Sequence, residues 1–187
     1  EQRQGKKQID FYKNQDSFGF EEYKALQDHC NKNSITFLST PFDEDSADLL
    51  EKLNVPAYKI ASTDLTNLPF LEYVAKKQKP MILSVGMGTL DEISESVDVV
   101  RSTGNAQIAL LHCIVEYPAP MDHANLNFIK TLQKKFPDYP IGFSDHTLGL
   151  IAPVVATVLG AKVIEKHFTI DKTIRGAPDH LISVNPR

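Results

Sequence analysis

Short apolar runs rich in branched side chains recur along this chain, and each is followed by a stretch with helical periodicity. Six such runs predict strands, at residues 35–39, 57–61, 81–85, 107–113, 141–144 and 162–166. Strands that are apolar along nearly their whole length and are separated by helices form parallel sheets covered on both faces. The alternation therefore predicts an α/β protein built on a parallel sheet.

Signals for the ends of helices support the alternation. Asp43 precedes a helical pattern and suits the positive end of that helix. Thr89 and Glu92 have the spacing of a capping box, and Gly104 can take the left-handed position after the last turn. Pro69 suits a first helical turn. These positions place helices between the predicted strands.

Two architectures arrange parallel strands and helices in this way. An open doubly wound sheet is disfavoured because no Gly-x-Gly-x-x-Gly sequence follows the first strand and polar residues follow every strand. That distribution favours a TIM (β/α)₈ barrel, which usually needs about 250 residues. The 187 residues here would hold about six of the eight units, so the expected barrel is incomplete. Residues 1–16 lack a clear period and are predicted to be a loop or linker before a partial barrel at residues 17–187.

Composition excludes several classes of protein. Hydrophobic residues make up 42% of the chain and charged residues 24%, as in ordinary globular domains. The net charge is -4 and no run of Lys or Arg is long, so neither nucleic acid nor a membrane is an expected partner. Cys30 lies in a helical pattern and Cys113 in a strand, which gives no disulfide framework and favours a reducing, cytoplasmic location.

Ionisable and hydroxyl side chains gather where the predicted strands end. In a barrel these ends share one mouth. A Lys with several hydroxyl groups suits a phosphate, and two His residues on neighbouring strands suit a divalent metal that keeps positions for water and substrate. The strand-end residues are Thr40, Lys59, Ser62, Asp64, Ser84, His112, Glu116, Tyr117, Ser144, Asp145, His146, Glu165 and His167.

Each of these residues also has a structural interpretation. A His at a strand end often serves only as a hydrogen-bonded part of the fold. Lys59 can run outward along the surface, and Ser62, Ser84 or Ser144 can cap a helix. Asp145 can orient a metal ligand or cap the helix that follows. The residue types alone leave both interpretations open.

Seven groups of residues, in order, resemble motifs of the sialic acid synthase family, which includes N-acetylneuraminate synthase and its legionaminate, pseudaminate and spore-coat polysaccharide relatives. The resemblance runs from about Phe20 to the end of the chain. The motifs are Phe37-Leu-Ser-Thr-Pro-Phe42, Tyr58-Lys-Ile-Ala-Ser62, Ile82-Leu-Ser-Val-Gly-Met87, Leu111-His-Cys113 with Glu116-Tyr-Pro118, Gly142-Phe-Ser-Asp-His-Thr-Leu-Gly149, Glu165-Lys-His-Phe-Thr169 and Pro178-Asp-His180.

The resemblance implies a TIM-barrel transferase that condenses phosphoenolpyruvate with an N-acylated amino-hexose. The products would be a nine-carbon 2-keto sugar acid and phosphate, and the metal would be Mn²⁺ or Mg²⁺. By motif position, His146 and His167 would bind the metal, and Asp64 and Glu165 would be catalytic. Substrate binding would fall to Thr40, Lys59, Ser62, Ser84, Ser144, Tyr117 and Asp179.

The chain also departs from the family pattern. The first strands of the barrel and a small C-terminal antifreeze-like domain are expected to be absent, and the full-length protein is expected to be a homodimer. Ile114 and Val115 replace a small polar pair common in the family, which affects recognition of the sugar. Two other functions stay open: condensation of phosphoenolpyruvate with a phosphorylated sugar, and a non-catalytic degenerate barrel.

Overall fold

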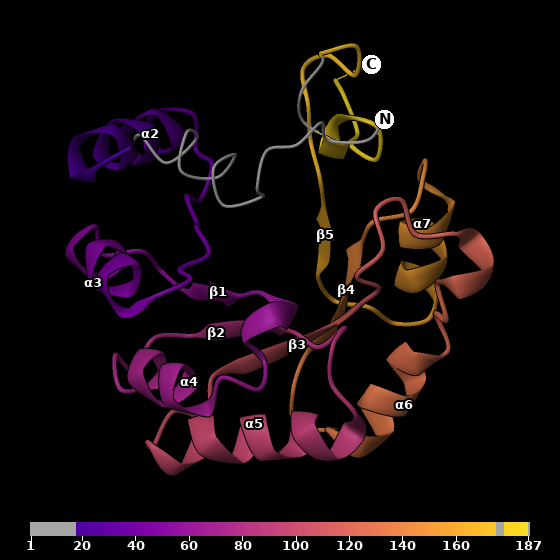
Figure 1. Cartoon of the computed structure of the whole chain (residues 1–187), viewed down its shortest axis with the longest axis horizontal. Helices are drawn as coiled ribbons and strands as arrows, with labels where there is room; N and C mark the ends of the chain where they lie inside the picture. Colours follow the sequence, from indigo (N-terminus) through magenta and orange to yellow (C-terminus); the bar gives the residue numbers. More distant parts are fainter. Residues whose placement is uncertain (1–17, 175–177, 187) are drawn as a thin grey trace, which may run out of the picture.

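Five parallel strands form a curved sheet in a computed structural model that describes residues 18–174 and 178–186. The strands lie side by side in chain order and change direction progressively from the first to the last (Figure 1). They are β1 (Tyr58–Ile60), β2 (Met81–Ser84), β3 (Ile108–Cys113), β4 (Ile141–Asp145) and β5 (Ile164–Lys166). With helices on the outer side, this is the wall of an incomplete TIM barrel, as predicted.

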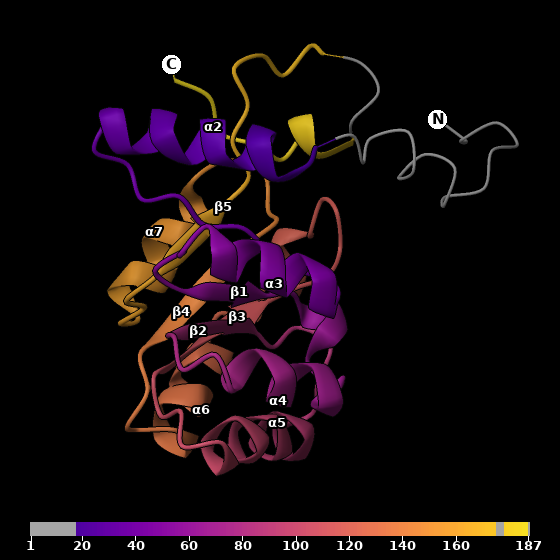
Figure 2. The ribbon, with the colours of Figure 1, turned by 90° about the vertical axis from the view of Figure 1, so that its left-hand side faces the viewer.

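Helices connect the strands along the outer side of the sheet. Figure 2 shows three of them, α3 to α5, following one another beside the strands. The helices are α2 (Phe20–Lys32), α3 (Glu44–Lys52), α4 (Leu68–Ala75), α5 (Leu90–Ser102), α6 (Phe128–Lys135) and α7 (Ile151–Val158), and three short 3₁₀ turns are η1 (Ser62–Asp64), η2 (Met121–His123) and η3 (Pro178–His180). None of the helices in the described ranges combines the length and the apolar character needed to cross a bilayer.

The predicted helix ends are confirmed. The Asp43 carboxylate accepts a hydrogen bond from the Ser46 backbone N–H and caps α3. Thr89 and Glu92 form a complete capping box at the start of α5. Gly104, after the end of α5, has a φ of 86°, a left-handed conformation that glycine adopts at little cost. These local signals fix the places at which the chain turns back toward the sheet.

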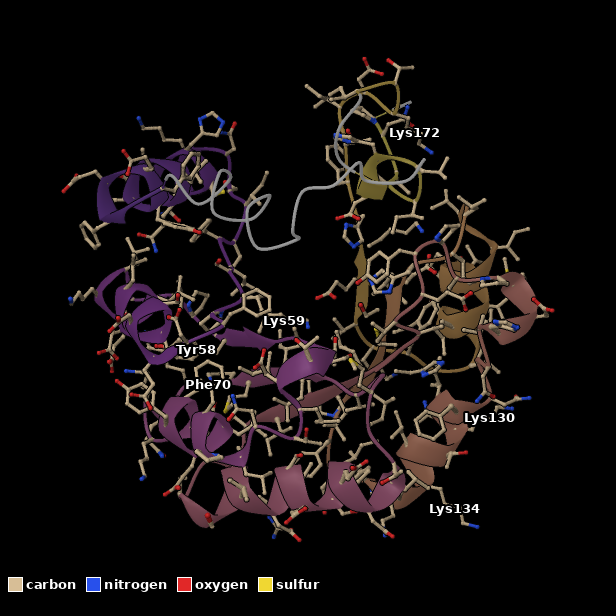
Figure 3. The ribbon with its side chains drawn as sticks, viewed as in Figure 1. Tyr58, Lys59, Phe70, Lys130, Lys134 and Lys172 are labelled. Carbon is tan, nitrogen blue, oxygen red and sulfur yellow. The ribbon has the colours of Figure 1, made fainter. Side chains whose placement is uncertain are left out.

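Alternation along the strands separates the core from the mouth of the barrel. Figure 3 labels Tyr58 and Lys59 on opposite sides of β1. Tyr58 points into the layer between sheet and helices, where its hydroxyl donates to the Ala47 carbonyl oxygen. Lys59 points to the inner side of the curved sheet. The apolar layer between sheet and helices includes Leu50, Leu71, Leu83, Ile93, Leu110, Ile129 and Phe143.

One predicted strand is wrong. Residues 35–39 do not join the sheet, and among the described residues β1 pairs only with β2. A strand requires a ladder of hydrogen bonds with a neighbour, which an apolar, branched sequence favours but cannot supply by itself. Ile35 remains 61% exposed. The described chain therefore holds five strands instead of six, and the predicted linker at residues 1–16 lies outside the described residues.

Candidate active site

Lys59 places a cation on the inner side of the sheet. Its ammonium group donates hydrogen bonds of 2.8 Å to the Ser84 hydroxyl and to the Ile60 carbonyl oxygen. One carboxylate oxygen of Glu165 lies 3.6 Å from the same nitrogen. Burial lowers the pKa of Lys59, and the charge of Glu165 acts in the opposite direction. The cation is thus desolvated and faces the centre of the mouth.

Ser144 adds a second donor to the same carboxylate. Ser144 and Glu165 are opposite one another in the register of β4 and β5, and the hydroxyl donates a 2.7 Å hydrogen bond to Glu165 Oε1. We call Lys59, Ser84 and Ser144 the donor cluster. Lys59 and Ser144 contact the two oxygens of one carboxylate, which is the arrangement that holds an oxyanion of a ligand. The prediction that these three residues lie together is confirmed by these contacts.

Just after β2, the chain at Gly86 approaches the end of β3 closely. The Gly86 backbone N–H donates to the Ser62 hydroxyl oxygen at 3.0 Å. A Cβ atom at Gly86 would lie 2.5 Å from the Cys113 carbonyl oxygen, so a larger residue would force the strands apart. The Cys113 sulfur lies 3.8 Å from His146 Nδ1, and burial raises the pKa of its thiol. Cys113 is not among the residues predicted for the site. Its position at the end of a strand, where the other site residues lie, could have indicated it.

Two imidazole rings lie beside the donor cluster. His146 follows β4 and His167 follows β5, and their ring centres are 5.3 Å apart. Tyr117 stacks on His146 at 4.0 Å and meets the edge of His167 at 5.7 Å. Asp179 in η3 has a carboxylate oxygen 3.9 Å from His167 Nδ1. The adjacency of the two imidazoles follows from their positions after neighbouring parallel strands.

The imidazole pair fits part of the coordination sphere of a divalent metal. His146 Nδ1 donates a 2.7 Å hydrogen bond to the Ile114 carbonyl oxygen, which leaves Nε2 as the free acceptor. Burial lowers the pKa of His146 and favours the neutral form that binds metals. With metal–nitrogen bonds of about 2 Å, two imidazoles on one ion have ring centres roughly 5 Å apart. In the part of the chain that the structure describes, no group of three or more His, Cys, Asp or Glu side chains surrounds one point.

Ser144 of the donor cluster and both rings of the imidazole pair border one hollow of about 200 Å³ at the mouth. It is lined by Thr40, Ser144, Asp145, His146, Glu165, Lys166 and His167. Five of the residues predicted for the site border this hollow, and Lys59, Ser84, Tyr117 and Asp179 adjoin them through the contacts described above. Asp64 lies in η1, where its carboxylate contacts the Thr63 hydroxyl at 3.3 Å, and its assignment as a catalytic residue stays a prediction.

The contacts of His112 are those of a side chain packed inside the fold. Its Nε2–H donates a 2.8 Å hydrogen bond to the Ala124 carbonyl oxygen, and its ring stacks on Phe143 with a centre-to-centre distance of 5.5 Å. Phe128 of α6 meets the other side of the ring. His112 therefore belongs to the layer between sheet and helices, and burial lowers its pKa.

The chain is similar to known proteins in sequence and in structure. The model of the NeuB family matches residues 1–187. An uncharacterized protein of Methanocaldococcus jannaschii is 54% identical over 166 residues, which are 89% of this chain and 49% of the relative. N,N'-diacetyllegionaminic acid synthase of Campylobacter jejuni is 47% identical over 167 residues, 88% of this chain and 49% of that enzyme.

A solved structure shows the same arrangement of elements. The crystal structure of N-acetylneuraminic acid (sialic acid) synthetase from Leptospira borgpetersenii serovar Hardjo-bovis, in complex with citrate, superposes with a TM-score of 0.87. It is 38% identical, and the match covers 90% of this chain and 58% of that one. The chain spans about half the length of the curated relatives it matches.

Proposed function

Because the chain belongs to the NeuB family, as its resemblance to the sialic acid synthases predicted, we propose that it carries part of the active site of an enzyme that makes a sialic-acid-type sugar. The observation that carries this proposal is the shared hollow. The imidazole pair, which suits a divalent ion, borders this space together with Ser144 and Glu165. Lys59, which bonds to Ser84, lies 3.6 Å from the Glu165 carboxylate, so the donors suited to an oxyanion adjoin the same space. Condensation of an anionic enol with a sugar aldehyde needs both.

Phosphoenolpyruvate is the proposed ligand of the donor cluster. Its phosphate and carboxylate groups are oxyanions, and Lys59, Ser84 and Ser144 offer a desolvated cation with two short donors. Ser62 and Thr40, close to the same space, are proposed to complete this binding. The Glu165 carboxylate contacts Lys59 and Ser144, so a phosphate that binds to these two donors has to replace it.

The proposed acceptor is an N-acylated amino-hexose in its open-chain form. Carbon 3 of phosphoenolpyruvate forms a bond with the aldehyde carbon, and the aldehyde oxygen takes the π electrons and a proton to become a hydroxyl group. Water adds at carbon 2 and supplies that proton, and the bond from carbon 2 to the phosphate oxygen breaks to give the 2-keto acid and phosphate. Lys59 and the serines hold the negative charge of the departing phosphate. Glu165, or Asp64, accepts the proton of the attacking water. Tyr117 and Asp179, which adjoin the imidazole pair, are placed to contact the sugar.

His146 and His167 are proposed to hold Mn²⁺ or Mg²⁺, with Asp179 nearby. When bound, such an ion supplies polarisation of the aldehyde oxygen. The chain's own contribution is to present both rings in a fixed orientation. The Ile114 carbonyl oxygen fixes the proton of His146 on Nδ1, and Tyr117 restrains the ring by stacking on it. A homodimer is proposed for the intact protein on the family resemblance alone.

The test is product formation by the intact protein. Phosphoenolpyruvate, Mn²⁺ and a panel of amino-hexoses are supplied, and phosphate release is measured together with the mass of the keto acid. We expect one phosphate for each nine-carbon acid formed, with loss of both in a His146→Ala, His167→Ala double variant. Lys77→Met is the matched control, because Lys77 is a similarly buried cation that pairs with Asp48 at the helix layer.

The other two functions are distinguished in the same assay. Turnover only with sugar phosphates would replace the proposed acceptor by a phosphorylated one. A folded protein that binds neither phosphoenolpyruvate nor Mn²⁺, and forms no product with any sugar, would point to a non-catalytic barrel.

A further inference from the structure

A buried ion pair lies directly behind the imidazole pair. Asp145 is fully buried at the end of β4, and Lys166 ends β5 with only 8% of its side chain exposed. The two residues are opposite one another in the register, and Asp145 Oδ2 lies 2.7 Å from Lys166 Nζ. Each comes immediately before one of the two His residues. Successive side chains of a strand point to opposite faces, so the side chains of the ion pair point away from the face that carries the imidazoles, although Asp145 and Lys166 also border the hollow.

Both members of the ion pair also form hydrogen bonds with the backbone of Thr147, the residue that follows His146. The Thr147 N–H donates to Asp145 Oδ1 at 2.8 Å, and Lys166 Nζ donates to the Thr147 carbonyl oxygen at 2.7 Å. The His146 carbonyl oxygen accepts a 3.0 Å hydrogen bond from the Ala119 N–H. The peptide groups on both sides of Thr147 are therefore fixed, and one of the fixing groups comes from β5.

A buried ion pair is a poor way to gain stability. Removing two charges from water is costly, and apolar residues of similar volume often stabilise a protein equally well or better. Close cross-strand placement of the charges does fix the relative position of the two strand ends. That position sets the distance between the imidazoles, which a shared metal ion needs within a narrow range.

We propose that Asp145 and Lys166 are positioning residues that hold His146 and His167 at the separation required for one divalent ion. The proposal rests on the proposed metal-binding role of the two His residues. Neither Asp145 nor Lys166 contacts the ion; each acts through the residue that follows it. Loss of the ion pair should loosen the imidazole pair and weaken metal binding even where the fold survives.

The experiment measures Mn²⁺ affinity of the intact protein by electron paramagnetic resonance titration, with the folded fraction followed by circular dichroism. Asp145→Asn keeps an acceptor for the Thr147 N–H but removes the charge, and Lys166→Met keeps the length of the side chain. The Asp145→Asn, Lys166→Met double variant avoids leaving one charge buried alone. We expect each folded variant to bind Mn²⁺ at least tenfold more weakly, the range found for partners of metal ligands. The visible spectrum of bound Co²⁺ should also change.

Lys77→Met is the control for loss of an ion pair away from the mouth, in which the Lys77 side chain is 9% exposed and the Asp48 side chain 44% exposed. The Mn²⁺ affinity of this variant should equal that of the wild type. Wild-type affinity in the folded double variant would overturn the proposal, and so would an equal loss of affinity in Lys77→Met. His146→Ala and His167→Ala separate the two proposals. If they lose Mn²⁺ binding while the double variant retains it, only the positioning role fails; if they retain it, the metal assignment fails and the positioning role falls with it.

Discussion

The Ser144 hydroxyl donates a 2.7 Å hydrogen bond to the Glu165 carboxylate across the β4–β5 ladder, in which the two residues are direct partners. Lys59, from the other end of the sheet, approaches the second oxygen of the same carboxylate. Glu165 thus lies between the donor cluster and the imidazole pair. Its position suits a group that gives way to an anionic substrate and then takes part in the reaction.

Glu165→Gln should separate binding from turnover. The amide has no charge to compete for Lys59, so the Kd for phosphoenolpyruvate should be unchanged or smaller. If Glu165 accepts the proton of the attacking water, kcat should fall by about 10²- to 10⁴-fold. Calorimetric binding and steady-state kinetics on the intact protein check both. A parallel loss of phosphoenolpyruvate binding would show that Glu165 serves in binding instead.

Lys59→Met should weaken phosphoenolpyruvate binding. A hydrogen bond to a charged group contributes about 1.5–3 kcal/mol, so the Kd should rise roughly 10- to 150-fold. Thermal stability should change little, because the variant also removes a desolvated charge. Lys77→Met is the control and should leave the Kd unaltered. An unaltered Kd in Lys59→Met would remove Lys59 from the binding site.

The free energy of unfolding should fall in mild acid because of His112. Burial lowers the pKa of His112 in the folded state, so the unfolded chain binds a proton at a higher pH, near 6.5. The contribution of neutral His112 to the free energy of unfolding is fully present above that pH. It is lost as the pH falls toward the lowered pKa of the folded state, and the free energy of unfolding then changes by at most about 1.4 kcal/mol per pH unit.

His112→Gln tests this dependence, because the amide can still donate to the Ala124 carbonyl oxygen. Urea denaturation of the wild type and the variant between pH 7 and pH 5 gives the two slopes. The variant should show the shallower one. Equal slopes would mean that protonation of His112 is not linked to unfolding.

The two cysteines should differ in reactivity. Cys113 is buried, and burial raises the pKa of its thiol, which lowers the amount of reactive thiolate. Cys30 on α2 is only partly buried and serves as an internal control. Iodoacetamide followed by peptide mass spectrometry should show Cys30 modified well before Cys113 in the folded protein, with similar rates in urea. Faster modification of Cys113 in the folded state would indicate an open mouth.

Sequence patterns predicted most of the fold because five of the apolar runs have neighbours in register. The pattern at residues 35–39 has the same composition but no ladder partner among the described residues, and composition reports only the tendency to be extended. His146 and His167 could be paired from the sequence because both follow neighbouring parallel strands. The hydrogen bond from His146 to the Ile114 carbonyl oxygen could not be predicted, because every residue has a backbone carbonyl and the sequence does not show which one is used.

The Asp145–Lys166 pair could be predicted only in part from the sequence. Both residues precede a His at the end of a strand, and their charges are opposite. What the pattern lacked was the register, which decides whether two strand-end residues stand opposite one another or are offset. The sequence therefore indicates an orienting or capping role for Asp145 but does not identify Lys166 as its partner.

The free side of β1 has a practical consequence for work with this polypeptide. Within the described residues, β1 bonds only to β2, so its other side offers backbone donors and acceptors to any extended chain that approaches. Expressed by itself, the polypeptide should self-associate through this side as its concentration rises, and light scattering should detect growing particles. A designed strand that is added to pair with this side of β1 should reduce the self-association.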